Sequence, residues 1–424
     1  MSKKEIIKKG YLDIKNFLMS YQKIWEKEVI DSYPQAFLEY PNEWPRDLEN
    51  LSFDDLEKLD SRCQEFFLGT HSFFQSSTGK LIKQIEDLEK KWAPPHYNHQ
   101  NNLELKMADM LFLKPKKKYE IEQLLTPLQD FFSDLEVTSA YDLGGGVGHL
   151  SRIISEYFKT GKNQTIKVTS IDINSDFQKS GEKKWKKFKK VNFNYLNADL
   201  NTLDIDAIAE HNYATVGLHT CGELAISQMR LMKNSKAMAC FNVPCCYQHL
   251  KIESANLSRF AKENPLPWTI NALTLAAKAH YREADNPKHK KSFQDKWQVK
   301  NYRYALQMIL CKHHLNHIST VGEAPMKDYY QPFADYALAK LKQFKITNET
   351  HRSLEIFYSS EATQSRLKEL FLCNIIRWQF GRLLELLIIY DRHLWALEQN
   401  FKVDCFSVFN ERISPRNTAF ILKK

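Results

Sequence analysis

The spacing of apolar residues divides the chain into three regions. From about residue 1 to 105, apolar residues recur three and four positions apart, which predicts amphipathic helices. From about 106 to 247, short β-rich runs such as "IKVTSIDIN" alternate with helical runs, and this alternation predicts a parallel sheet. From 248 the pattern is helical again, until the runs "KVDCFSVFN" and "TAFILKK" flank the turn "ERISPRN" and predict a terminal hairpin.

A glycine-rich turn follows the first predicted strand. In "YDLGGGVGHL" the strand closes on Asp142, and a helix is expected to start near His149. Glycines in such a turn allow main-chain amides to approach a ligand closely, which predicts a nucleotide-like ligand. The glycines expected around that ligand, beside Asp142, are Gly144, Gly146 and Gly148.

Acidic residues end the next two predicted strands. Asp172 closes the second strand, where a carboxylate can bind both ribose hydroxyls, although it lies 28 residues after Gly144 and the usual gap is about 20. Asp199 closes the third strand and can accept a hydrogen bond from an adenine amino group, with Leu200 beside the ring. We therefore predict S-adenosylmethionine as the cofactor, because dinucleotide-binding turns more often read GxGxxG.

Two further motifs end the fourth and fifth predicted strands. "HTCG" contains His219 and Cys221, and "PCCY" contains Cys245, Cys246 and Tyr247. Neighbouring parallel strands would bring these side chains together beside the transferable methyl group. We interpret them as the catalytic end of a non-covalent, in-line transfer: His219 orients the acceptor or takes its proton, and Tyr247 or a cysteine positions it.

Other interpretations of the cysteines stay open. Zinc could use His and Cys ligands, but structural zinc normally takes cysteines two to four residues apart, and adjacent cysteines are hard to aim at one ion. We therefore assign no metal. Covalent C5-pyrimidine methylation would need "PC" followed by "TC", an order that the sequence lacks. Simple packing explains one buried cysteine but not the whole cluster.

The ordered motifs "DLGGGVGHLSR", "VGLHTCGEL", "VPCCYQHL" and "ISPRNTAFILKK" resemble the methyltransferase-like protein twenty-five group, also called ribosomal RNA adenine dimethylase domain-containing proteins. The resemblance covers most of the chain, although the group usually has His where this chain has Tyr119. Related motifs occur in tRNA 2'-O-methyltransferases of the thirteenth type, so the resemblance implies RNA methylation. Adenine N6-dimethylation is not expected, because "GLHTCGEL" lacks the Asn/Asp-Pro-Pro-aromatic loop that holds the amine.

Charge bears on the same question. The chain has 60 Lys and Arg against 51 Asp and Glu, a net charge of +9, and several basic runs contain aromatic residues. "KKWKKFKK" is typical of a solvated helix face with its aromatics buried, whereas "KPKKKYE" and the run from 286 to 303 are better placed to contact RNA. The expected substrate-binding residues are Lys116, Lys117 and Tyr119.

We expect an RNA partner, tRNA or rRNA, and neither a membrane nor DNA. A protein or small-molecule substrate, or a non-catalytic binding module on the same fold, are the alternatives. The eight cysteines form no disulfide framework, and no signal segment or membrane span is evident, so we expect an intracellular, cytoplasmic protein.

The predicted fold is α/β: a seven-stranded, Rossmann-like class I methyltransferase sheet whose last two strands pair antiparallel. An α-helical N-terminal region precedes the sheet, and a helical insertion precedes its last two strands. The expected ranges are 1–105 for the N-terminal region, 106–247 for the cofactor-binding core, 248–368 for the insertion on the substrate side, and 369–424 for a helix and the two strands that complete the sheet.

Overall fold

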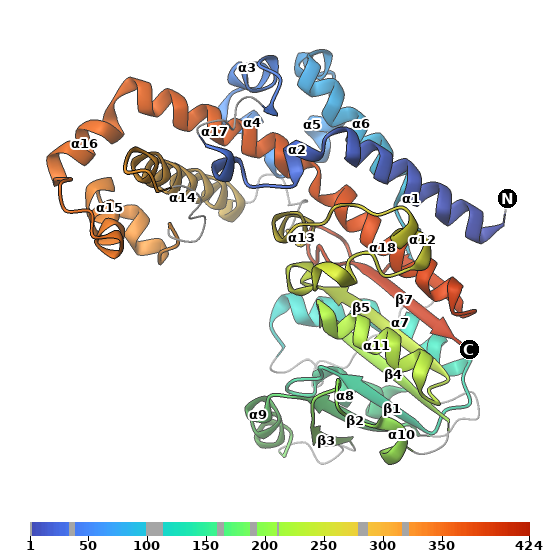
Figure 1. Ribbon diagram of the computed structural model, residues 1–424. Coiled ribbons are helices and arrows are strands. Elements are labelled where there is room, and N and C mark those ends of the chain that lie inside the picture. Colours follow the sequence, from blue (N-terminus) through green and yellow to red (C-terminus); the bar gives the residue numbers. More distant parts are fainter. Residues whose placement is uncertain are drawn as a thin grey trace. The chain divides into compact units, whose positions relative to one another are not determined.

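The computed structural model describes residues 2–33, 39–98, 113–158, 165–186, 193–209, 212–278, 287–315 and 322–424. The chain forms two compact units, drawn in Figure 1. Unit 1 comprises Met1–Asn16, Trp92–Ala279 and Glu385–Lys424, and unit 2 comprises Phe17–Lys91 and His280–Leu384. Both units are discontinuous in the sequence, whereas the four expected ranges are consecutive.

Unit 1 contains a seven-stranded sheet in the order β3-β2-β1-β4-β5-β7-β6. The first five strands are parallel, and β7 pairs antiparallel with both β5 and β6. Figure 1 shows the C-terminal strand β7, in red, beside β5. This arrangement confirms the predicted fold class. The strands are β1 (Ser139–Leu143), β2 (Lys167–Asp172), β3 (Phe193–Asn197), β4 (Tyr213–Cys221), β5 (Ala239–Cys245), β6 (Lys402–Ser407) and β7 (Thr418–Lys423).

The central strands are apolar because helices cover both faces of a parallel sheet. Every residue of β1 and of β5 is buried. The strand order reverses at β1, which lies between β2 and β4, and in sheets of this kind ligands bind at the carboxyl ends of the strands near that reversal. The helices of unit 1 include α7 (Pro115–Ser133), α8 (His149–Tyr157), α9 (Ser175–Trp185), α10 (Ile205–Ile208), α11 (Glu223–Asn234), η5 (Tyr247–His249), η6 (Ile252–Ser254), α12 (Arg259–Glu263) and α13 (Ile270–Ala276).

Among its described residues, unit 2 consists of helices joined by loops and has no strand. It contains buried and partly buried ion pairs. Arg62 and Glu89 pair at 2.8 Å, with side chains 2% and 4% exposed. Glu28 pairs with both Lys300 and Arg377, each at 3.2 Å. Its helices are α2 (Gln22–Trp25), η1 (Val29–Ser32), α3 (Glu43–Glu49), α4 (Phe53–Asp60), α5 (Gln64–Leu68), η3 (Ser72–Gln75), α6 (Ser77–Trp92), α14 (Pro287–Lys312), η7 (Met326–Tyr330), α15 (Phe333–Leu341), η8 (Lys342–Phe344), α16 (His351–Ser359) and α17 (Glu361–Gln379).

Three of the described helices contain residues of both units. They are α1 (Lys3–Ser20), α18 (Gly381–Glu398) and α6, whose last residue Trp92 is assigned to unit 1. The apolar run from 367 to 399, which the sequence predicts to be one sheet-covering helix, is in fact most of α17 followed by α18. The break is at Phe380, whose amide turns back to the carbonyl of Arg377 at 3.2 Å, and a glycine follows it. Only the part from Glu385 onward belongs to unit 1.

The basic runs fall in different places. Most of the run from 286 to 303 lies on α14 in unit 2, and residue 286 is outside the described residues. In "KKWKKFKK", Trp185 is buried at the end of α9, as expected, and donates from Nε1 to the Val147 carbonyl at 2.7 Å. Phe188 lies outside the described residues. This Lys-rich run thus supports the glycine turn through its tryptophan.

Within the described ranges, no helix is both long and apolar enough to cross a membrane. The cytoplasmic location expected from the sequence stays a prediction.

The antiparallel hairpin is expected to be necessary for a stable sheet. Leu422 on β7 is 0% exposed, so Leu422→Ala should leave a cavity and lower the free energy of unfolding by about 2–5 kcal/mol. Chemical denaturation measures this change. Ile413→Ala, which truncates a side chain that is 36% exposed, is the control and should have little effect. Equal stability of the two variants would contradict the assigned role of β7.

Candidate active site

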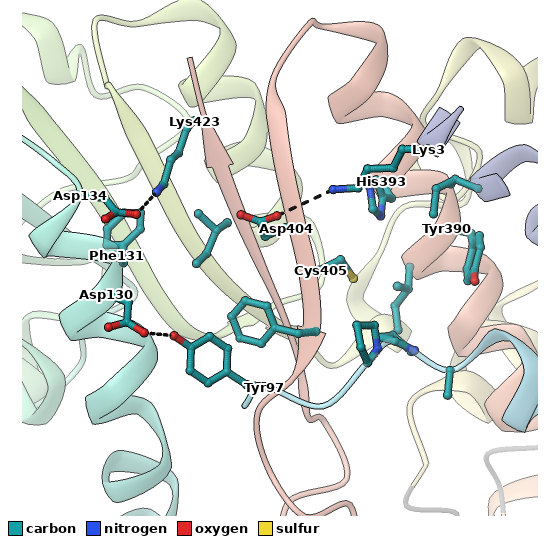
Figure 2. A pocket seen from close by; sticks show the side chains of 17 residues that line it. Lys3, Tyr97, Asp130, Phe131, Asp134, Tyr390, His393, Asp404, Cys405 and Lys423 are labelled. Carbon is teal, nitrogen blue, oxygen red and sulfur yellow. Dashed lines mark hydrogen bonds and ion pairs between the residues drawn. The ribbon is translucent and has the colours of Figure 1, made fainter. Parts of the chain in front are cut away.

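A cavity of about 500 Å³ in unit 1 is lined by segments of α1, α7, α18, β6 and β7 and by the chain from 93 to 97. Figure 2 shows its charged pairs, Lys423 with Asp134 at 3.0 Å and Lys3 with Asp404 at 3.8 Å. None of its lining residues belongs to the predicted site. The candidate active site is therefore built from the strand-end motifs and not from this cavity.

The glycine turn joins β1 to α8 and requires glycine for two reasons. Gly144, Gly146 and Gly148 have φ values of 72°, 56° and 82°, a left-handed region that disfavours other residues. Gly145 lacks that constraint, but a Cβ there would lie 2.2 Å from the Ser170 hydroxyl oxygen. A Cβ at Gly146, by contrast, would meet only the Asp172 carboxylate at 4.0 Å. The turn is therefore tightly packed at Gly145, whereas the space beside Gly146 is open and leaves room for a ligand.

Two of the predicted acidic residues contact this turn differently. Asp142 is 2% exposed and accepts a hydrogen bond from the Ser151 hydroxyl at 2.6 Å. Burial raises the pKa of Asp142 to about 6, although the Ser151 hydrogen bonds oppose the shift. Asp172 is half-buried and accepts from the amides of Gly146 at 2.9 Å and Asn174 at 2.8 Å. Asp142 thus supports the turn from its buried side, while Asp172 is held beside Gly146.

The third acidic residue follows β3. Asp199 and Leu200 are half-exposed, and one Asp199 oxygen accepts from the backbone amide of Asn201 at 2.9 Å. A carboxylate offers about four acceptor positions, so Asp172 and Asp199 both keep capacity for further hydrogen bonds. The open turn and these two carboxylates fit an adenosine-type cofactor: Asp172 would bind the ribose and Asp199 the adenine.

A buried glutamate organises the other side of the site. Glu120 on α7 is 1% exposed and contacts three segments. It accepts from Nε2 of His219 at 2.9 Å and from the Ser414 hydroxyl at 2.8 Å, and Lys117 lies 3.1 Å away. Burial alone would raise the pKa of Glu120, but the hydrogen bond and charge of His219, the charge of Lys117 and the Ser414 hydrogen bond outweigh it and lower the pKa to about 2.

Glu120 is not among the site residues expected from the sequence, although it lies inside the quoted run "KPKKKYEI". Its only signal is local: a glutamate on the buried face of a helix, three and four residues after lysines. Ser414 belongs to "ISPRN", a motif that contributes to the resemblance but suggests no role. The ion pair that joins them to His219 spans segments far apart in the sequence.

The "HTCG" motif ends β4 with two unusual backbone conformations. His219 has φ 62°, and the register of β4 against β5 shifts between Leu218 and Thr220, a bulge that re-aims the side chain. Gly222 has φ 52°, and a Cβ there would lie 2.5 Å from the backbone of His249. The histidine is thus directed to Glu120, and the glycine allows the β5 loop to approach.

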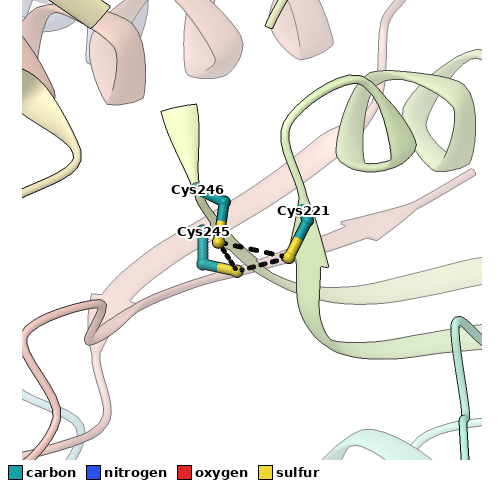
Figure 3. Close-up of side chains that lie close together, drawn as sticks. All are labelled: Cys221, Cys245 and Cys246. Atoms are coloured by element: carbon teal, nitrogen blue, oxygen red, sulfur yellow. Dashed lines mark hydrogen bonds between the residues drawn. The ribbon is translucent and has the colours of Figure 1, made fainter. Parts of the chain in front are cut away.

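Three cysteines converge where β4 and β5 end (Figure 3). The register pairs Cys221 with Cys245, and their sulfurs are 3.3 Å apart. The Cys246 sulfur lies 3.2 Å from that of Cys221 and 3.4 Å from that of Cys245. A hydrogen bond from Cys245 lowers the pKa of the Cys221 thiol to about 6, while the pKa values of Cys245 and Cys246 are raised. The sequence predicts that Cys221 of "HTCG" lies beside Cys245 and Cys246, and the structure brings the three sulfurs together.

The other predicted residues are placed as follows. Tyr247 is 1% exposed, and its ring lies 5.2 Å from the guanidinium carbon of Arg392 on α18, so it is part of the packed wall. Lys116 is exposed and 3.7 Å from Glu120. The Tyr119 hydroxyl accepts from the Asn410 amide at 2.7 Å and so anchors the C-terminal turn. His219 and the cysteines are brought together, because the Cys221 thiol donates to the His219 carbonyl at 3.4 Å.

The lowered pKa of Glu120 has a consequence for stability. A carboxyl group whose folded-state pKa is below its ordinary value of 4.5 stabilises the fold above that pH, and the contribution is lost as the pH falls toward about 2. Glu120→Gln should therefore lower the free energy of unfolding near neutral pH by about 1–3 kcal/mol, and the difference should vanish in acid. Denaturant unfolding across pH measures this, with Glu122→Gln on the same helix as the control. A constant difference at all pH values would contradict the prediction.

Two comparisons relate the chain to known proteins. Residues 116–253, about a third of the chain, match the family model described as a methyltransferase domain. Among solved structures, the chain is similar to coclaurine N-methyltransferase bound to N-methylheliamine and SAH. The identity is 11% and the TM-score 0.28, with 90% of this chain and 98% of that chain covered. A TM-score this low carries no argument about fold or substrate.

The matched segment begins in α7 beside Glu120 and ends in η6, so it contains the glycine turn, both strand-end acids and all three cysteines. Its boundaries and the sheet order agree with the cofactor site described above. The protein is therefore an S-adenosylmethionine-dependent methyltransferase, with its catalytic domain built around residues 116–253.

Proposed function

We propose that the protein methylates RNA, either tRNA or rRNA. The observation that carries the proposal is a set of basic side chains around the strand ends where His219 and the cysteines meet. S-adenosylmethionine supplies an electrophilic methyl group when it is bound. The residues of this chain bind the cofactor through the glycine turn, Asp172 and Asp199, and they prepare the acceptor.

His219 has the environment of a general base. Its Nε2 lies 2.9 Å from the Glu120 carboxylate, so a proton on Nε2 is held by that hydrogen bond. In this tautomer Nδ1 carries the lone pair and can accept a proton from a hydroxyl or amino group. Glu120 also stabilises the cation that forms, as the carboxylate of a catalytic triad does. This pair supports proton removal from a weakly acidic acceptor during methyl transfer.

The basic rim consists of Lys114, Lys116 and Lys117 at the start of α7, together with Arg416. Lys116 and Lys117 lie 3.7 and 3.1 Å from Glu120, the partner of His219, and Lys114 is the N-cap residue of the same helix. Arg416 interacts electrostatically with Cys246. Positive side chains at a site mouth favour a phosphate backbone, which dominates affinity for nucleic acids. The rim therefore supports RNA over a neutral small molecule.

The four sequence motifs also support an RNA substrate. We propose membership in the methyltransferase-like protein twenty-five group, on the four motifs that end β1, β4 and β5 and precede β7. Kinship with tRNA methyltransferases that share "HxCG" and "CCY" supports an RNA acceptor, with the substrate class decided by experiment because a fold hosts many substrates.

The substrate class can be read from labelled total cell extract. Purified protein and cofactor with a labelled methyl group are incubated with extract, and the products are treated with ribonuclease or with protease. Label in macromolecules should be released by ribonuclease and should resist protease. Label that resists ribonuclease and is lost to protease would overturn the proposal in favour of a protein substrate. Label found only in small molecules would overturn it as well.

The basic rim gives a sharper prediction. The double variant Lys114→Ala with Lys116→Ala should weaken RNA binding about tenfold and reduce the slope of log affinity against log salt by about 2, because two phosphate contacts are lost. Filter binding at several salt concentrations measures both. Cofactor affinity, measured by calorimetry, should not change.

Lys233→Ala with Lys236→Ala is the matched control. These exposed lysines lie in the last turn of α11 and in the loop from α11 to β5, so they are near the amino end of β5 and not near its carboxyl end. The control should bind RNA as the unmodified protein does. Equal losses in both double variants would show that only net charge matters and would contradict the assigned site.

A further inference from the structure

We propose that Cys221, Cys245 and Cys246 bind a zinc ion through three thiolates at the ends of β4 and β5. The fourth coordination position would take water or the methyl acceptor. This metal site goes beyond the RNA proposal and does not depend on it. Zinc sites with three protein ligands and one exchangeable position are typical of catalytic zinc.

The sulfur positions fit such an ion. A zinc–sulfur bond of about 2.3 Å in a tetrahedral site places neighbouring sulfurs about 3.8 Å apart. The three sulfur–sulfur distances are 3.2, 3.3 and 3.4 Å. Each sulfur would move outward by only a few tenths of an ångström, a shift within the reach of side-chain rotation. No helix or strand has to move to complete the site.

The backbone removes the stereochemical objection to adjacent cysteines. Successive residues of a strand point to opposite faces, so Cys245 and Cys246 in extended conformation would diverge. Cys246 instead has φ 52°, in the left-handed region, and its side chain lies on the same side as that of Cys245. Non-glycine residues in this conformation are strained and concentrate at functional sites. Burial alone does not explain the cluster, because Cys221 is exposed and Cys246 is half-exposed.

Nearby cations provide an independent observation. Arg392 is 1% exposed, and none of its three guanidinium nitrogens has a hydrogen-bond partner among the described residues. Its charge interacts with Tyr247, Asp391, Glu223 and Cys245. The adjacent carboxylate of Asp391 accepts instead from the amides of Leu257 and Ser258, at 2.6 and 2.9 Å.

Arg416 is half-exposed, but its Nη1 is buried without a hydrogen-bond partner in the described part of the chain, and its charge acts on Cys246. Buried cations normally require nearby negative charge. Zn²⁺ with three thiolates would carry a net charge of −1. The complex would therefore add negative charge beside both guanidinium groups, in addition to the charge that Asp391 and Glu223 already supply near Arg392.

Zinc binding at this site would release protons and would need no change of oxidation state. Each cysteine that is still protonated loses its proton to solvent as its zinc–sulfur bond forms. No oxidant or reductant takes part. An acceptor atom in the fourth position would be polarised by the ion beside His219.

Metal analysis of the full-length chain, purified under reducing conditions and loaded with zinc, is the first test. We expect about one zinc ion per chain and its loss in each of Cys221→Ser, Cys245→Ser and Cys246→Ser. Cys405→Ser, on β6 and half-exposed, is the control and should retain the ion. Circular dichroism of each variant separates loss of metal from loss of fold.

Cobalt provides a second readout that needs neither RNA nor turnover. Co²⁺ added to metal-free protein should produce a sulfur-to-cobalt charge-transfer band and release protons from the thiols. The band should be absent in the three cluster variants. Protein that shows no band and no bound zinc while its thiols remain reactive would overturn the proposal. The proposal would also be overturned if mass spectrometry detected a disulfide between Cys221 and Cys245 in protein freshly isolated under reducing conditions.

Discussion

The acceptor side of the active site depends on one buried carboxylate. Glu120 has an exposed fraction of 1%, and an ionised group at that depth is stable only with partners. Those partners are His219 at the β4 bulge, Ser414 in the C-terminal turn and Lys117 on its own helix. The final turn of the chain therefore helps to orient His219, the proposed catalytic base. The segment that joins the last two strands of the sheet thus also supports the active site.

The two sides of the site use backbone strain in different ways. On the cofactor side, left-handed conformations fall on Gly144, Gly146 and Gly148, where they cost little. On the acceptor side they fall on His219 and Cys246, whose side chains make them costly. The strained residues are the ones that aim a nitrogen and a sulfur. Within the site, left-handed non-glycine residues therefore occur where side-chain direction matters for chemistry.

The cofactor side and the sheet order could be predicted from the sequence because each signal is local: a glycine turn after a strand, an acid at a strand end, and a terminal hairpin. Glu120 could not, because its bond to Ser414 joins residues 294 positions apart. The ends of two neighbouring strands predict the convergence of the three cysteines, whereas the φ angle of Cys246 that directs its sulfur and the helix break at Phe380 could not be predicted. Neither leaves a compositional trace.

The central claim is that the cofactor binds at the carboxyl ends of β1, β2 and β3, with Asp172 as its ribose ligand. Calorimetric titration of Asp172→Ala with S-adenosylmethionine tests it most directly. Asp176→Ala on the neighbouring helix, with its side chain 85% exposed, is the control. The account predicts that affinity falls at least about tenfold in the first variant only, with similar melting temperatures. Unchanged affinity in Asp172→Ala would contradict it.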